Sequence, residues 1–177
     1  MVLKRVLLVI LVFFNISCFL YLISPAPKIP DLPNSVKSTE PGDTIQIPNV
    51  AAYYTNQSRT QVINFYKANY SALWRIILNH PPEKSKQIFR DTMRSYYLEE
   101  LVLPYKESLF VNGFEWQNDV FTKPEKRIKN KLLYQGQEFK AKITIRTFPS
   151  SIPRRLIAFY FTQTAIIGSI FLLTKHA

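Results

Sequence analysis

Hydrophobic residues gather at the two ends of the chain, and a polar, basic stretch separates them. Residues 6–23 and residues 156–174 contain no charged side chain. At about 1.5 Å per residue, each stretch would form a helix of roughly 27–28 Å, close to the hydrocarbon thickness of a bilayer. The pattern predicts an N-terminal transmembrane signal anchor over residues 1–24 and a C-terminal transmembrane helix over residues 154–177.

The N-terminal stretch has the features of a signal sequence, because Lys4 and Arg5 precede it. We expect it to be retained, since Pro27 directly follows the only small-residue cleavage site, at residues 24–26. Two alternatives remain open. One is cleavage at that site, and the other is lipidation of Cys18, because residues 15–18 (Asn-Ile-Ser-Cys) resemble a bacterial lipobox.

The C-terminal stretch has one alternative, which is a buried helix of a soluble domain. A helix at a protein surface shows a polar stripe along one side. Here the polar residues Thr162, Gln163 and Thr164 are instead consecutive in the sequence. We therefore favour a membrane-spanning helix.

Residues 25–48 contain six prolines. This spacing favours extended backbone and predicts a semi-rigid linker between the first apolar stretch and a folded domain. The domain itself is expected over residues 49–153.

Two helices are predicted near the start of that domain, after a strand at residues 50–54. Ser58 and Gln61 have the spacing of a capping box, and apolar residues recur from there at helical intervals up to residues 79–80, where Pro81 and Pro82 follow. A second helix is expected from near Pro82 to just before Pro104.

Alternating residues predict strands in the second half of the domain. Asn112-Gly113 lies between Leu-Phe-Val (109–111) and Phe-Glu-Trp (114–116), which predicts a hairpin with a type I′ turn, and Gly136 predicts a second hairpin that joins residues 132–134 to 139–148. The order of elements predicts an α+β fold, in which two helices pack on a mainly antiparallel sheet and a transmembrane helix flanks each end.

Residues 62–67 (VINFYK) and residues 112–116 (NGFEW), with the strands around them, carry a loose resemblance to a known type of domain. The chain resembles small, uncharacterised, membrane-tethered or lipoprotein-type bacterial α+β domains. The resemblance covers about half of the chain and implies an architecture. It implies no site residue.

Composition narrows the possible chemistry. One cysteine excludes a disulfide scaffold and a Cys-rich zinc module, and no nucleotide-binding glycine motif occurs. We expect no catalytic residue, no metal site and no cofactor. An enzyme of unrecognised type would need to gather His80 with Glu99, Glu100 or Asp91.

The formal net charge of +11 directs attention to anionic partners. The expected anionic-surface residues are Lys123, Lys126, Arg127, Lys129, Lys131, Arg154 and Arg155. The expected partners are the lipid bilayer and other membrane proteins. Nucleic acid is disfavoured, because we expect the domain to lie outside the cytoplasm.

That orientation depends on Lys4 and Arg5, which favour a cytoplasmic N-terminus. Basic residues at the ends of the central segment favour the reverse, but the rule weakens for loops longer than about 60 residues. We expect a protein of the plasma (inner) membrane with an extracytoplasmic domain, acting as a non-enzymatic binding or assembly module. The alternatives are a cytoplasm-facing basic domain that binds nucleic acid or anionic lipid, and an enzyme of unrecognised type.

Overall fold

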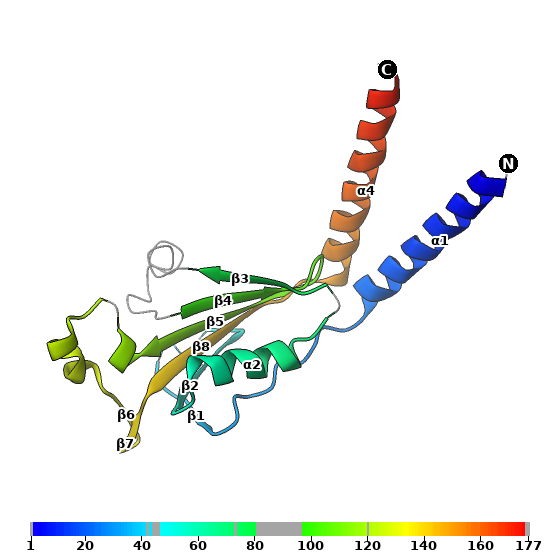
Figure 1. Ribbon diagram of the computed structural model, residues 1–177. Helices are drawn as coiled ribbons and strands as arrows, with labels where there is room; N and C mark the ends of the chain where they lie inside the picture. The colour runs from blue at the N-terminus through cyan, green and yellow to red at the C-terminus, as the bar shows by residue number, and fades with distance from the viewer. Residues whose placement is uncertain are drawn as a thin grey trace. The chain divides into compact units, whose positions relative to one another are not determined.

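A computed structural model of the chain describes residues 2–41, 43, 47–72, 74–80, 97–119 and 121–175 (Figure 1). The chain divides into two compact units. One unit combines Met1–Ala26 with Pro149–Ala177, and the other is Pro27–Phe148. The two termini of the chain therefore belong to the same unit.

The terminal unit consists of the helices α1 (Val2–Ile23) and α4 (Ile152–Lys175). Both are long and apolar enough to cross a membrane, and only 6% of the most apolar window of each is buried. A core helix of a soluble protein would be mostly buried, so this alternative does not fit α4. Polar side chains bond to their own helix, as Asn15 Nδ2 does to the Leu11 carbonyl at 2.9 Å, which suits a segment without water around it.

The central unit is built on a six-stranded antiparallel sheet with the strand order β1-β2-β8-β5-β4-β3 (Figure 1). Its strands are β1 (Ser35–Lys37), β2 (Val50–Thr55), β3 (Ile76–His80), β4 (Tyr97–Val102), β5 (Ser108–Glu115) and β8 (Ala141–Phe148). The expected α+β class and the antiparallel sheet are confirmed.

One predicted helix of this unit is present as α2 (Arg59–Asn69). The capping box forms as expected, because the Ser58 side chain accepts from the Gln61 backbone and the Gln61 side chain accepts from the Ser58 backbone. The buried side chains Val62, Ile63 and Tyr66 share a hydrophobic core with residues from β2, β4, β5 and β8.

The expected length of this helix is wrong, and so is the second helix where the structure describes it. The first helix ends at Asn69, and residues 76–80 form β3. Residues 97–102 form β4, which pairs with β3 and β5, whereas residues 82–96 lie outside the described part. Helical spacing was present in the sequence, but pairing within the sheet overrides such local preferences.

The predicted turn at Asn112-Gly113 is also wrong, because both residues lie inside β5. Gly113 faces Tyr97 of β4 across the ladder. A Cβ atom at residue 113 would overlap the Tyr97 ring. The glycine therefore permits a close approach between two strands and does not make a turn.

The hairpin around Gly136 is confirmed. β6 (Leu132–Tyr134) pairs with β7 (Gln137–Phe139), and Gln135 and Gly136 have φ values of 50° and 76°, as a type I′ turn requires. The strand expected over residues 139–148 divides at Lys140, and its second part is β8. Two 3₁₀ helices, η1 (Trp116–Asn118) and η2 (Pro124–Asn130), connect β5 to this hairpin.

Residues 25–48 are more than a linker. Leu32 is buried in the main core, and residues 35–37 form β1 at the edge of the sheet. The Tyr54 hydroxyl donates to Glu40, and the Lys142 ammonium bonds to both Glu40 and Asp43 at 2.9 Å. The folded unit thus starts at Pro27 and not at residue 49.

Candidate functional site

The side chain of Arg155 connects the two apolar helices of the terminal unit. It is 4% exposed, although it belongs to the first turns of α4. Its Nη1 donates to the carbonyls of Leu22 at 3.2 Å and Ser24 at 3.1 Å, at the end of α1. Its Nε and Nη2 donate to the Ser150 carbonyl at 3.1 and 2.8 Å. A cation at the C-terminal end of a helix satisfies free carbonyls and interacts favourably with the helix dipole.

This geometry corrects the expectation that Arg155 binds an anionic surface. Its guanidinium is buried against backbone carbonyls, whereas the neighbouring Arg154 is exposed. The sequence showed two adjacent arginines at the start of an apolar stretch. It carried no signal that one of them reaches the end of the other apolar stretch.

The other five expected anionic-surface residues lie in and beside η2, in the central unit. Lys123, Lys126 and Lys129 are exposed, and no carboxylate in the described part of the chain pairs with them. Arg127 bonds to the carbonyls of Thr122 and Gln117, and Lys131 pairs with Glu138 at 2.8 Å. Three of the five cations therefore remain available to an anion.

The residues that an enzyme would need do not come together where the structure describes them. Glu99 and Glu100 are adjacent on β4, so their side chains point to opposite faces of the sheet. Glu100 lies with His80, at 3.6 Å between Oε2 and Nε2, and the His80 ring stacks on Phe110. Asp91 lies outside the described residues.

Glu99 belongs to a buried polar cluster at the start of α2, which the sequence analysis missed. It is 4% exposed, pairs with the guanidinium of Arg59, and accepts from Asn79 Nδ2. The Arg59 guanidinium also lies 5.2 Å from the centre of the Tyr97 ring.

A second buried carboxylate completes this cluster. Glu115 is 3% exposed and accepts the Arg59 backbone N–H at 3.2 Å, near the positive end of the α2 dipole. The two carboxylates thus flank one arginine, and the arrangement fixes the start of α2 to β4 and β5. Its signal in the sequence was weak, because the members come from four separate segments.

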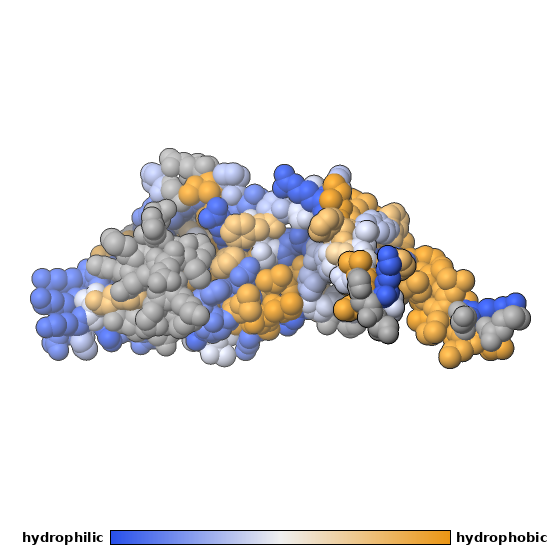
Figure 2. Space-filling model, turned by 90° about the horizontal axis from the view of Figure 1, so that it is seen from above, coloured by the Kyte–Doolittle hydropathy of each residue, from blue (hydrophilic) through white to orange (hydrophobic). Residues whose placement is uncertain are grey.

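The strand β3 forms an edge of the sheet and exposes its apolar side chains. Ile76, Ile77 and Leu78 are 51%, 41% and 44% exposed. Figure 2 looks down on the molecule and shows hydrophobic surface in the middle of the view, in the region where β3 lies in Figure 1. An edge strand offers backbone N–H and C=O groups to a further strand, and natural edges are commonly protected by charges or proline. β3 itself contains no proline and no Lys, Arg, Asp or Glu, although Arg75 precedes it and Pro81 follows it.

Comparison with known proteins does not assign the chain to a family. No protein-family model matches the chain, and no curated protein or solved structure is significantly similar to it. The resemblance to membrane-tethered bacterial domains stays a prediction. Within the described residues, no group of three His, Cys, Asp or Glu side chains could hold a metal ion.

Proposed function

We propose that this protein is a membrane-anchored, non-enzymatic binding or assembly module. In this proposal α1 and α4 cross the plasma (inner) membrane, and the central unit lies on the extracytoplasmic side. The observation that carries it is the pair of exposed apolar helices whose domain-side ends share Arg155. Two spans that meet at one junction would place both chain termini on one side of the membrane and the central unit on the other side.

The central unit supports binding better than catalysis. Its buried Glu99 is neutralised by Arg59, and Glu100 lies beside His80 on the opposite face. The exposed edge of β3 offers a partner two kinds of contact, which are backbone hydrogen bonds and apolar side chains on both faces. We therefore propose that an extended segment of another protein adds to the sheet at β3.

Membrane extraction and protease digestion test the anchoring. We expect the full chain, expressed in bacterial cells, to stay in the membrane pellet after alkaline carbonate washing. Added protease should digest the central unit in spheroplasts while a cytoplasmic marker stays intact. Extraction into the aqueous phase would refute the anchor, and digestion in inverted vesicles alone would place the unit in the cytoplasm.

Site-specific photo-crosslinking in the same cells tests the partner. A photoreactive residue at Leu78 should give a discrete adduct, whereas one at Thr60, exposed on α2, should give none. Substituting Ile77→Lys should remove the Leu78 adduct, because a buried ammonium opposes the added strand. Identical adduct patterns at the two positions would contradict the use of β3.

Anionic-surface binding is a second candidate, favoured by the exposure of Lys123, Lys126 and Lys129. Each lysine near an anionic membrane contributes about 1 kcal/mol, so changing all three to glutamate should weaken binding of anionic vesicles to the nanodisc-held protein at least 100-fold. The wild-type affinity should fall as salt increases. Equal binding by the triple variant would exclude this function, and selective binding of nucleic acid would favour the cytoplasmic alternative.

A further inference from the structure

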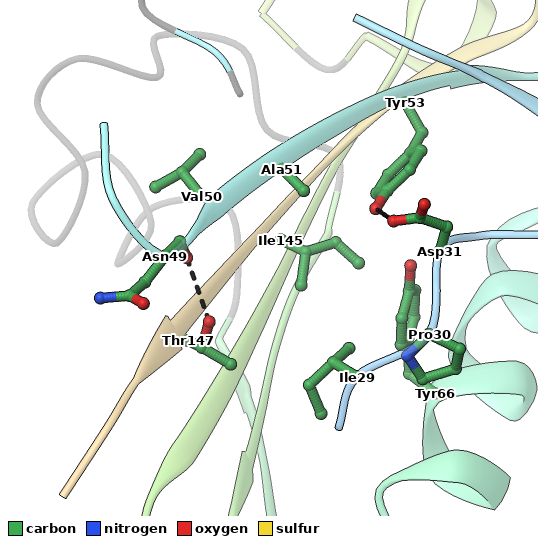
Figure 3. Close-up of a pocket in the computed structure, with 10 residues that line it drawn as sticks. All are labelled: Ile29, Pro30, Asp31, Asn49, Val50, Ala51, Tyr53, Tyr66, Ile145 and Thr147. Carbon is green, nitrogen blue, oxygen red and sulfur yellow. Dashed lines mark hydrogen bonds between the residues drawn. The ribbon is translucent and has the colours of Figure 1, made fainter. Parts of the chain in front are cut away.

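A small cavity lies at the end of the sheet opposite β3. It has a volume of about 170 Å³ and opens between the segment that precedes β1, the strands β2 and β8, and the helix α2 (Figure 3). Its apolar wall includes Ile29, Pro30 and Ile145. Its polar lining residues are Asp31, Asn49, Tyr53, Tyr66 and Thr147, and the Asp31 carboxylate lies close to the hydroxyls of Tyr53 and Tyr66.

The hydroxyl of Tyr66 is the unusual feature of this cavity. The Tyr66 side chain lies in the last turn of α2 and is fully buried, and within the described part of the chain its hydroxyl has no hydrogen-bond partner. In Figure 3 this hydroxyl points toward Asp31 and Tyr53. A buried hydroxyl without a partner is costly, so such groups in native proteins generally bond to water or to a ligand.

Asp31 offers an acceptor beside the Tyr66 hydroxyl, and its side chain is 69% exposed, so it lies at the rim of the cavity (Figure 3). Its Oδ1 accepts both from the Tyr53 hydroxyl at 2.5 Å and from the Lys37 ammonium at 3.1 Å. The Tyr53 bond, followed by that of Lys37, holds the pKa of the Asp31 carboxyl below its usual value, so the group is ionised at neutral pH. Its Oδ2 has no bond to any residue that the structure describes.

We propose that this cavity binds a compact, uncharged ligand with a hydroxyl group, such as a small phenol or cyclic alcohol. A hydroxyl can accept from Tyr66 and donate to Asp31 Oδ2 at the same time. A ring can lie against Ile29, Pro30 and Ile145, and a cavity of about 150 Å³ in another protein holds benzene.

Other ligand classes fit less well. The Asp31 carboxylate repels a carboxylate or phosphate. An ammonium group would pair with Asp31 but would leave the Tyr66 hydroxyl without an acceptor. The volume of about 170 Å³ would enclose only part of a nucleotide or of a lipid chain.

This site goes beyond the proposed function, because β2 and β8 are separated from β3 by two further strands. A negative result for ligand binding would not contradict the proposal that a partner binds at β3. The reverse also holds, so the two proposals fail separately.

The test is a titration of the full chain, held in nanodiscs, with phenol as the probe and anisole as the matched comparator. Anisole has the same ring but cannot donate a hydrogen bond to Asp31. Amide resonances of β2 and β8 report binding by NMR. We expect saturable shifts and an affinity for phenol at least tenfold higher than that for anisole.

Two variants test whether the affinity for phenol depends on the Tyr66 hydroxyl. Tyr66→Phe keeps the buried ring and should reduce the phenol affinity at least tenfold. Tyr54→Phe removes a hydroxyl that bonds to Glu40, away from the cavity lining, and should leave the affinity unchanged. Absence of saturable phenol binding in the wild type, or equal affinities for phenol and anisole, would overturn the proposal and leave ordered water as the occupant. This comparison within the wild type decides the question even if Tyr66→Phe fails to fold.

Discussion

Replacing Arg155 by methionine should loosen the junction between α1 and α4. Methionine keeps much of the apolar bulk but removes every donor. The wild-type side chain makes four hydrogen bonds to the carbonyls of Leu22, Ser24 and Ser150, at 2.8–3.2 Å. In the variant these carbonyls would lose their cationic donor at a site that is largely buried.

The magnitude follows from the number and kind of these bonds. A hydrogen bond to a charged group contributes about 1.5–3 kcal/mol, but water near the membrane surface will replace part of what is lost. Three carbonyls lose a donor, and each unsatisfied buried acceptor costs about 1–3 kcal/mol, so the range is about 3–9 kcal/mol. We expect a loss near the lower end, about 3 kcal/mol, which corresponds to a roughly 100-fold change in the opening equilibrium.

Amide hydrogen exchange in nanodiscs measures this opening. The reporter is the Ser24 amide, which bonds to the carbonyls of Leu20 and Tyr21 at the end of α1. In Arg155→Met its exchange should accelerate about 100-fold, and Arg155→Lys should give an intermediate rate because lysine lacks the planar fork of donors.

The exposed neighbour Arg154 supplies the control, since it occupies the same turn of α4. Arg154→Met should exchange at the wild-type rate. If Arg155→Met and Arg154→Met have the same effect, the guanidinium does not hold the junction and the reasoning is refuted.

Three further predictions concern the central unit, each measured by denaturant unfolding of the detergent-solubilised chain. Glu99→Ala should lower the free energy of unfolding by about 1–3 kcal/mol, because it removes a buried carboxylate from Arg59, whose side chain is 35% exposed and is then solvated by water, whereas Glu100→Ala should cost less than half as much; equal losses would show that burial of the ion pair is unimportant. Gly113→Ala should cost about 1–3 kcal/mol through overlap with Tyr97, and Tyr97→Leu in the same chain should make the glycine substitution nearly neutral; strictly additive losses would contradict the overlap. Burial, with the bond to Glu40, raises the pKa of Tyr54 to about 12. The neutral phenol therefore contributes fully to the free energy of unfolding below pH 10, and this contribution is lost as the pH rises from 10 to 12. Tyr54→Phe should flatten the plot of unfolding free energy against pH in that range, and an unchanged plot would show that Tyr54 does not cause the loss.

The elements that the sequence predicted correctly are those with a strong local cause. The capping box at Ser58 fixes the start of α2 by backbone hydrogen bonds over one turn, and Gln135-Gly136 adopts positive φ within two residues. Length and the absence of charge were sufficient to identify α1 and α4 as helices apolar enough to span a membrane.

The elements that the sequence predicted wrongly depend on distant partners. Residues 97–102 form a strand because β3 and β5 pair with both of their edges, and no local pattern records that pairing. Asn112-Gly113 has a strong turn signal, yet the ring of Tyr97 determines why glycine is present.

The same limit applies to the candidate sites. The basic residues near η2 were visible as a cluster of charge in the sequence. The Arg155 junction was not, because it joins residues that are more than 130 positions apart. The cavity beside Tyr66 likewise needs four segments to meet.

The closed junction at Arg155 has a consequence for folding. Because Ser24 and Ser150 bind the same guanidinium, the chain between them forms a loop whose ends are held together as long as these hydrogen bonds last. A covalent closure of about 100 residues removes unfolded-state entropy equivalent to roughly 5 kcal/mol at 25 °C. Insertion of both helices in a bilayer would impose a similar restriction on the central unit before it folds, so part of its stability would come from the membrane itself and would disappear if the chain were cut at either tether.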